Sequence, residues 1–141
     1  MSKRRGFTLI ELMVVVAVVA ILAAIALPSF LSQIRKARRG DVEQAVQQIA
    51  LSEERFRADG TTYSTSFATP PTGIGASPYT STYYTVALTT GTTTGYKITA
   101  TAVGTQANDT ASGTTCTPLV YDFNITTAGV VTKAPTACWA Q

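Results

Sequence analysis

The sequence predicts an α+β fold, in which one long N-terminal helix packs on a four-stranded antiparallel sheet with a C-terminal disulfide loop. Three observations support this prediction. An apolar run near the N-terminus continues into a stretch whose apolar residues have helical spacing. Four later segments alternate apolar and polar residues, which is typical of half-buried strands. Two cysteines lie in the last quarter of the chain.

Composition places the chain among folded proteins and argues against the common enzyme and metal sites. Its 141 residues are 45% hydrophobic and 13% charged, where soluble domains average about 25% charged. The absence of histidine excludes a Ser-His-Asp or Cys-His triad and the usual histidine metal ligands. Two cysteines cannot supply a four-thiolate metal site. We expect no enzyme activity, no cofactor and no metal, because nothing supplies a nucleophile or pocket around Asp109 and Asp122, which we expect to be solvated.

The net charge of +3 comes from a short basic segment at the N-terminus. Lys3, Arg4 and Arg5 supply three of the 11 basic residues, and without them the chain has as many acidic as basic residues. A basic isoelectric point with this origin is weak evidence for nucleic-acid binding. We therefore expect that nucleic acid is not bound specifically, and an adhesin or DNA-binding tip subunit stays an alternative.

Residues 7–27 form an almost wholly apolar run that is long enough to span a bilayer as a helix. Its 21 residues match the roughly 20 that a membrane-spanning helix needs. The basic residues 3–5 before it place the N-terminus on the cytoplasmic side. A secretory signal peptide would have a shorter run with a cleavage site after it, whereas here the small-residue junction between Gly6 and Phe7 precedes the run. Cleavage there would remove residues 1–6 as a leader and keep the helix in the mature protein.

Glu11 is the one charged residue inside this apolar run. A carboxylate at the centre of a membrane helix costs about 2.5–3.5 kcal/mol, and less near the end. The side chain either reaches the interface from its place one turn after Phe7, or it awaits a positive partner. Cleavage before Phe7 would create that partner, an α-amino group, on the same or a neighbouring chain. We favour this second interpretation, in which the pair fixes the register of assembly.

Residues 28–59 are predicted to form the second, amphipathic half of the helix. Pro28 has no N–H group for the carbonyl four residues earlier, so we expect a kink there. Gly60 is a stop signal at the far end. The apolar stripe that would cover the sheet consists of Val42, Ala45, Val46, Ile49 and Phe56.

A basic cluster follows the membrane-spanning run. It consists of Arg35, Lys36, Arg38 and Arg39. We expect this cluster to be solvated or to face lipid headgroups, in preference to a specific partner site.

Residues 83–141 are predicted to form the sheet, after a connecting loop at residues 60–82 that is rich in Gly, Pro, Ser and Thr. The first two strands flank a glycine-bounded turn, which is typical of a hairpin, and a turn at residues 127–129 precedes the last strand. One apolar face of four antiparallel strands would cover the helix stripe. The predicted strands are residues 84–89, 96–102, 119–126 and 130–133.

Cys116 and Cys138 are expected to form a disulfide that bounds the loop 116–138. With the N-terminus in the cytoplasm, the sheet would lie in the periplasm, where disulfides persist. Closing a loop of this length is worth roughly 3 kcal/mol in the chain-entropy description. The alternative is a pair of free buried thiols.

The segment Lys3-Arg4-Arg5-Gly6-Phe7-Thr8-Leu9-Ile10-Glu11-Leu12 closely resembles the class III signal of type IV pilins. The resemblance implies that a prepilin peptidase cuts after Gly6 and that Phe7 becomes the N-methylated first residue. It also implies that Glu11 is the carboxylate used in assembly. The six-residue leader indicates the type IVa branch.

The C-terminal half is similar to PilE-type minor pilins of the same family. The shared features are the Tyr-x-Ile-x-Ala pattern from Tyr96, the pair Gln106 and Asp109, and the Cys-Trp ending at Cys138. The chain departs from the family at one cysteine, which stands at Cys116, four residues later than the family's position. A C-terminal disulfide is common in the family, and this favours the predicted pairing.

The resemblance implies the pilin fold and a structural subunit of a type IV pilus, of the minor-pilin type, that supports pilus assembly, motility, adhesion or DNA uptake. The implied partners are other pilin subunits, prepilin peptidase and an assembly platform in the inner membrane. The subunit would wait in the inner membrane with a periplasmic sheet and then enter an extracellular pilus, with residues 7–27 in the filament core. The alternatives are a major pilin of the same filament and a pseudopilin of a type II secretion system.

Overall fold

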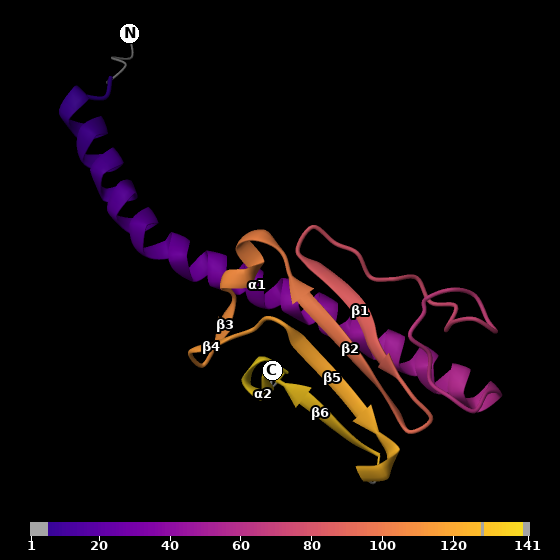
Figure 1. Ribbon diagram of the computed structural model, residues 1–141. Helices are drawn as coiled ribbons and strands as arrows, with labels where there is room; N and C mark the ends of the chain where they lie inside the picture. Colours follow the sequence, from indigo (N-terminus) through magenta and orange to yellow (C-terminus); the bar gives the residue numbers. More distant parts are fainter. Residues whose placement is uncertain (1–5, 128, 140–141) are drawn as a thin grey trace. The chain divides into compact units, whose positions relative to one another are not determined.

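The computed structural model describes residues 6–127 and 129–139 (Figure 1). The basic residues 3–5 and Ala128 of the predicted turn lie outside the described residues. The elements, in chain order, are α1 (Leu9–Asp59), β1 (Tyr84–Gly91), β2 (Gly95–Ala102), the 3-10 helix η1 (Gly104–Asn108), β3 (Thr110–Ala111), β4 (Thr114–Thr115), β5 (Leu119–Asn124), the 3-10 helix η2 (Ile125–Thr127), β6 (Val130–Ala134) and α2 (Thr136–Trp139).

Helix α1 contributes to both units of the chain, which divide between Ile34 and Arg35. Of the helices described, α1 alone is long and apolar enough to cross a membrane, with a mean hydropathy of 3.0 over its most apolar 18 residues. Pro28 lies inside the helix, with helical residues on both sides. The expected kink at Pro28 stays a prediction.

The second half of α1 is helical because it is rich in strong helix formers and buries one face. Val42, Val46 and Ile49 of the predicted stripe are buried, with Ala50 beside them, whereas Ala45 and Phe56 are only partly buried. The helix ends at Asp59. After it, the N–H of Gly60 donates to the carbonyl of Arg57, and the Arg57 side chain donates to the carbonyl of Gly60 at 2.8 Å.

The four-stranded sheet has the order β1-β2-β5-β6, with every neighbouring pair antiparallel. The register pairs Val86 with Ala100 between β1 and β2, and Tyr96 with Phe123 between β2 and β5. In the second unit, α1 runs along one face of this sheet (Figure 1). The predicted α+β fold, with one helix on a four-stranded antiparallel sheet, is confirmed.

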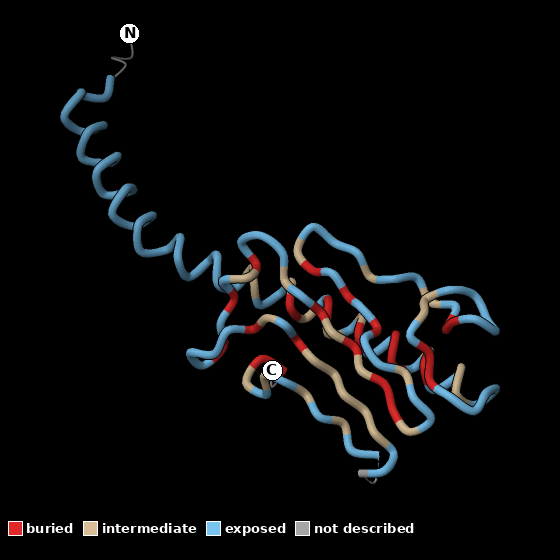
Figure 2. Tube along the Cα trace, viewed as in Figure 1, coloured by how far each residue is buried: buried red, intermediate tan, exposed pale blue. Residues whose placement is uncertain are grey.

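The core lies between this part of α1 and the sheet. Alternate residues of β1 and β2 are buried, and they join the buried face of α1 in one cluster (Figure 2). Sheet residues buried there are Tyr84, Val86, Leu88, Tyr96, Ile98, Ala100 and Leu119. Alternation of apolar and polar residues therefore identified the buried face of the first two strands correctly.

The end of β5 differs from the prediction. The strand was expected to continue to residue 126, but it ends at Asn124, and Ile125 is 43% exposed. The side-chain Oδ1 of Asn124 accepts hydrogen bonds from the backbone N–H and the hydroxyl of Thr126. This local turn competes with strand pairing, which is why the apolar Ile125 does not extend the buried face.

The segment between β2 and β5 contains structure that the sequence did not predict. It holds η1 and the short β3–β4 hairpin, and the N–H of Cys116 bonds the carbonyl of Asp109 at 2.9 Å. The hairpin turns at Ser112 and Gly113, with φ values of 50° and 78°. Positive φ at both central residues defines a two-residue turn of the type that favours Gly and Asn.

The loop between α1 and β1 is attached to the tip of the β1–β2 hairpin. The N–H of Tyr63 donates to the carbonyl of Thr92 at 2.8 Å. A Cβ atom at Gly91 would lie 2.4 Å from the carbonyl oxygen of Ser64, so only glycine permits this approach. Tyr63 and Ser64 are thereby buried against the end of the sheet.

Candidate functional site

The N-terminal residues that the sequence singled out lie at the start of α1. Phe7 is 85% exposed, and Glu11 stands in the first turn. The N–H of Glu11 donates to the hydroxyl of Thr8 at 3.3 Å. Thr8 is thus the N-cap of α1, and Glu11 stands at N3, the spacing of a Ser/Thr-x-x-Glu capping box. Sequence reasoning missed this local role, although the Thr-x-x-Glu spacing was visible.

The apolar segment after Glu11 is exposed along its whole length. All residues from 9 to 33 are exposed, and the large apolar side chains up to Leu31 are 48% to 75% accessible (Figure 2). Monomeric soluble proteins rarely expose contiguous apolar patches larger than a few hundred Å². This segment is therefore a surface for lipid or for other protein chains.

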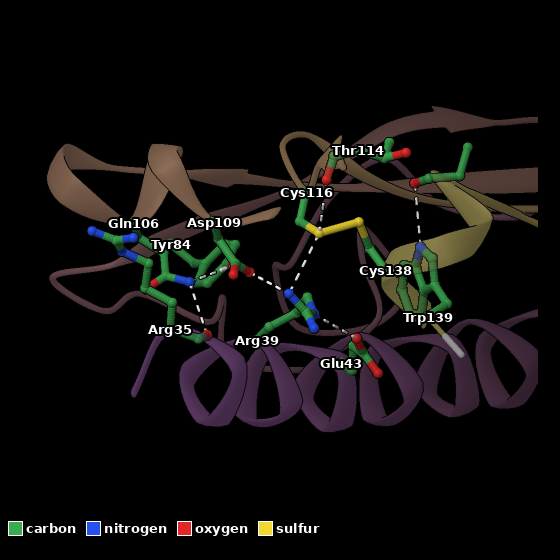
Figure 3. A network of polar contacts seen from close by, with 11 residues as sticks. Arg35, Arg39, Glu43, Tyr84, Gln106, Asp109, Thr114, Cys116, Cys138 and Trp139 are labelled. Atoms are coloured by element: carbon green, nitrogen blue, oxygen red, sulfur yellow. Dashed lines mark hydrogen bonds and ion pairs between the residues drawn. A yellow bond between two sulfur atoms is a disulfide. The ribbon is translucent and has the colours of Figure 1, made fainter. Parts of the chain in front are cut away.

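A polar network lies between α1 and the segment that follows β2 (Figure 3). The guanidinium of Arg39 pairs with the carboxylate of Asp109, Nη1 to Oδ2 2.5 Å, and both side chains are at most 4% exposed. Arg39 Nε also lies 3.8 Å from Oε1 of Glu43, one turn further along α1. A buried charge is tolerated when it is paired, so Asp109 and Arg39 depend on each other.

Gln106 extends the network to the helix backbone. Its Nε2 donates to the carbonyl of Arg35 at 3.0 Å and to the hydroxyl of Tyr84 at 3.2 Å, and the residue is fully buried. Burial raises the pKa of the Tyr84 hydroxyl, while the Gln106 hydrogen bond lowers it. Gln106 and Asp109 together hold the segment after β2 against the first two turns of α1 in this unit.

Two expectations about this region are wrong. Arg39 was expected to be solvated or to face headgroups with its basic neighbours, but it is buried in an ion pair. Asp109 was expected to be a solvated acid, but it is the partner of Arg39. Asp122 does lie near the surface, 2.9 Å from Lys97 in a cross-strand pair with both side chains about 40% exposed.

The disulfide lies beside this network. Cys116 and Cys138 are bonded and both fully buried, which confirms the predicted pairing. Arg39 Nη1 lies 3.4 Å from the sulfur of Cys116 (Figure 3). The bond fastens α2 to the β3–β4 segment, and the indole of Trp139 donates to the carbonyl of Ala134 at 3.2 Å.

A second buried acid lies near the end of α1. Glu53 is fully buried; its Oε2 accepts the N–H of Ser64 at 3.0 Å, and its Oε1 has no hydrogen-bond partner among the described residues. Burial raises the pKa of Glu53, the Ser64 hydrogen bond lowers it, and the charge of Glu54 raises it further. This carboxyl attaches the start of the loop to the helix.

The described residues hold no cluster of metal-ligating side chains. Groups of three or more Cys, Asp or Glu that could hold a metal ion do not occur among residues 6–127 and 129–139. The buried acids bond arginine or backbone groups and line no catalytic pocket. The main features are an exposed apolar helix segment, an N-cap at the start of α1 and a second unit that contains a disulfide bond.

Two family descriptions match the sequence and together reach from its first residue to residue 120. The prokaryotic N-terminal methylation motif matches residues 1–27. A family described as "Type IV minor pilin ComP, DNA uptake sequence receptor" matches residues 28–120, well over half of the chain. No solved structure matches the chain.

Curated relatives are similar to the chain over shorter segments. The prepilin peptidase-dependent protein D of Escherichia coli is 54% identical over 44 residues, which are 31% of this chain and 30% of that protein. The fimbrial protein EcpB of Eikenella corrodens is 58% identical over 60 residues, 43% and 38% of the two chains. The type IV major alpha-pilin of Moraxella bovis is 39% identical over 77 residues, 53% and 48%. The chain spans about half or less of the length of these relatives.

Proposed function

Since the chain belongs to the family of type IV minor pilins, we propose that it is a structural subunit of a type IV pilus. The proposal assigns it no bond-making chemistry of its own. Its work is to be anchored in a membrane, to be processed at its N-terminus and to pack into a filament.

The exposed apolar helix is the observation that carries this proposal. The described part of the chain leaves residues 9–31 exposed, and their hydropathy suits a bilayer. Transfer of this segment from lipid into a bundle of identical or related helices keeps the apolar surface out of water in both states. The same segment can therefore lie in the inner membrane before assembly and in the helical core of the pilus afterwards.

The N-terminus supplies the register of assembly in this proposal. Prepilin peptidase cuts between Gly6 and Phe7, and Phe7 becomes the methylated first residue. The new amino group lies within one turn of Glu11, and on a neighbouring chain it would meet the same carboxylate. Thr8 caps the start of α1 by accepting the backbone N–H of Glu11, so the cap and the assembly carboxylate lie on different side chains.

The second unit forms the outer part of the subunit in this proposal. Because the basic leader favours the cytoplasmic side, the sheet and its disulfide would lie in the periplasm before export. The other proposed partners are further pilin subunits and the assembly platform of the inner membrane.

Intact-mass spectrometry of pili sheared from the native cell surface tests the proposal. We expect a minor species that begins at Phe7, is one methyl group heavier than the bare chain and two hydrogens lighter because of the disulfide. A dominant species of that mass would make the chain a major pilin. A processed species confined to the membrane fraction would contradict the pilus assignment and favour a pseudopilin.

A receptor for DNA is the second candidate, because the description of the matching family names a DNA uptake sequence receptor. Its test is binding of the full chain in detergent to a duplex carrying an uptake sequence and to a scrambled duplex of equal length. Specific binding would give a difference between the duplexes that persists as salt weakens both. Equal, salt-sensitive binding would support the expectation that DNA is not bound specifically.

A further inference from the structure

Three basic side chains in the first turn of the second unit lack an acidic partner. Arg35 and Arg38 are partly exposed and Lys36 is exposed, and none of the three forms an ion pair within the described part of the chain. The fourth member of the cluster, Arg39, pairs with Asp109 and lies 3.8 Å from Glu43. Three positive charges thus remain on α1 directly after its exposed apolar segment.

Arg38 is held in a fixed orientation by an aromatic ring. Its guanidinium carbon lies 3.5 Å from the centre of the Tyr83 ring. This contact uses the face of the guanidinium and leaves the N–H groups at its edge free. A planar set of N–H donors is suited to bidentate bonding of a phosphate group.

The three charges lie on both sides of the buried Arg39, with Arg35 and Arg38 on one side of it and Lys36 on the other. Successive residues of an α-helix are about 100° apart, so Lys36 and Arg38 lie on opposite flanks, with Arg35 between them. A duplex or a globular partner would meet one flank only. The second unit covers the helix between these flanks, because Arg39 is buried there against Asp109, and a layer of lipid headgroups beside this turn meets both open flanks.

The depth of the cluster also matches headgroups. The part of α1 before it, residues 9–34, is about 39 Å long at 1.5 Å per residue. A bilayer is about 40–45 Å thick when its headgroup regions are included. If Leu9 lies near one surface, Arg35 and its neighbours lie at the level of the phosphates of the other leaflet.

We propose that Arg35, Lys36 and Arg38 form a headgroup girdle that binds the phosphates of anionic phospholipids where α1 leaves the bilayer. The proposal rests on the membrane-anchored state proposed above. The girdle would hold the subunit at a fixed depth before assembly, and its charges would have to leave the lipid when the subunit enters a filament.

Lipid selectivity of the full chain, reconstituted in phosphatidylcholine vesicles, tests the girdle. Electron paramagnetic resonance of chain-labelled phosphatidylglycerol and phosphatidylcholine gives the relative association constant of the two lipids with the protein. One cation near a bilayer surface is worth about fivefold in binding, so we expect wild type to prefer phosphatidylglycerol by at least about fivefold. The preference should fall in 0.5 M salt, because exposed charges are screened.

Matched variants separate the girdle from overall charge. Arg35→Gln/Lys36→Gln/Arg38→Gln should lose the preference, whereas Arg55→Gln/Arg57→Gln/Lys97→Gln, with the same net charge, should keep it. Tyr83→Phe should preserve the preference because the ring remains, and Tyr83→Leu should lower it about two- to threefold, because the loss of the ring frees the Arg38 guanidinium.

Four results would overturn either the girdle or the membrane-anchored state. Flotation with vesicles distinguishes these two cases, because it shows whether the chain binds a membrane. A wild-type chain that floats with vesicles but prefers neither lipid overturns the girdle and leaves the pilin assignment intact. Equal loss of preference in both triple variants also overturns it, because net charge would then explain the effect. If the wild type shows no lipid preference and the girdle variant loses cross-linking between subunits, these cations belong to a protein interface. A chain that does not float contradicts the membrane-anchored state itself.

Discussion

The guanidinium of Arg39 and the carboxylate of Asp109 form a buried ion pair across 70 positions of the chain. The pair joins α1 to the end of η1, beside the Cys116–Cys138 disulfide. Its position gives the segment after β2 one ionic and one covalent attachment. We expect this corner to dominate the stability of the second unit.

The first prediction concerns Asp109. Asp109→Asn leaves the Arg39 charge buried without a carboxylate, which typically costs about 3–5 kcal/mol. Thermal unfolding of the full chain in detergent, followed by circular dichroism, measures the loss. Asp122→Asn is the control, because it removes an exposed pair worth about 1 kcal/mol or less. Equal small shifts for the two variants would refute the importance given to the buried pair.

The second prediction concerns the disulfide. Cys116→Ser/Cys138→Ser should lower the free energy of unfolding by roughly 3 kcal/mol, because the 22-residue separation closes a sizeable loop in the unfolded chain. Urea unfolding, with and without a reductant, checks this value. Reductant should destabilise wild type and leave the double variant unchanged. A wild type that is insensitive after complete reduction would contradict the expected contribution.

The third prediction separates the charge of Glu11 from the helix cap at Thr8. Glu11→Gln keeps a residue that can serve in a capping box but removes the negative charge. If charge pairing with the Phe7 amino group guides assembly, this variant should enter pili poorly. Thr8→Ala removes the cap and keeps the charge, so it should enter pili better than Glu11→Gln. The measurement is the amount of each variant in sheared pili at native expression, and the reverse order would exclude the assembly role.

The fourth prediction concerns Glu53 and pH. Burial raises its pKa above the ordinary value of 4.5, so the folded state favours the protonated carboxyl. The protonated carboxyl of Glu53 therefore stabilises the folded state below the pKa that Glu53 has in the unfolded chain. This stabilisation is lost as pH rises through the pKa that Glu53 has in the folded state. Glu53→Gln should therefore raise Tm at pH 7.5 and lose this advantage near pH 3.

Thermal unfolding across this pH range measures the effect, and its size should be a few degrees, since about 1 kcal/mol shifts Tm by roughly 4–8 °C in a small domain. Asp41→Asn is the control, because Asp41 is an exposed acid on the same helix. An advantage of Glu53→Gln that is equal at both pH values would show that packing, not ionisation, is the cause.

Local patterns predicted much of the fold, because they report contacts made close in sequence. The repeat Val42, Val46 and Ile49 identified the buried face of α1, and alternation from Tyr84 identified that of the first hairpin. The same rule failed at Ile125, where the side chain of Asn124 bonds the turn and ends the strand. Local hydrogen bonds of this kind compete with pairing and are hard to weigh from apolar spacing alone.

The sequence alone determined the features that depend on neighbouring residues: the apolar run with its single acid, the signal around Gly6 and Phe7, the long helix and the alternation of the first hairpin. Only the tertiary structure decided the fate of the charged residues in the second unit. Arg38 and Arg39 are adjacent and chemically alike, yet one stacks on Tyr83 at the surface and the other is buried against Asp109. The cost of burying a charge depends on which distant group faces it, and that group is placed by the path of the chain through space.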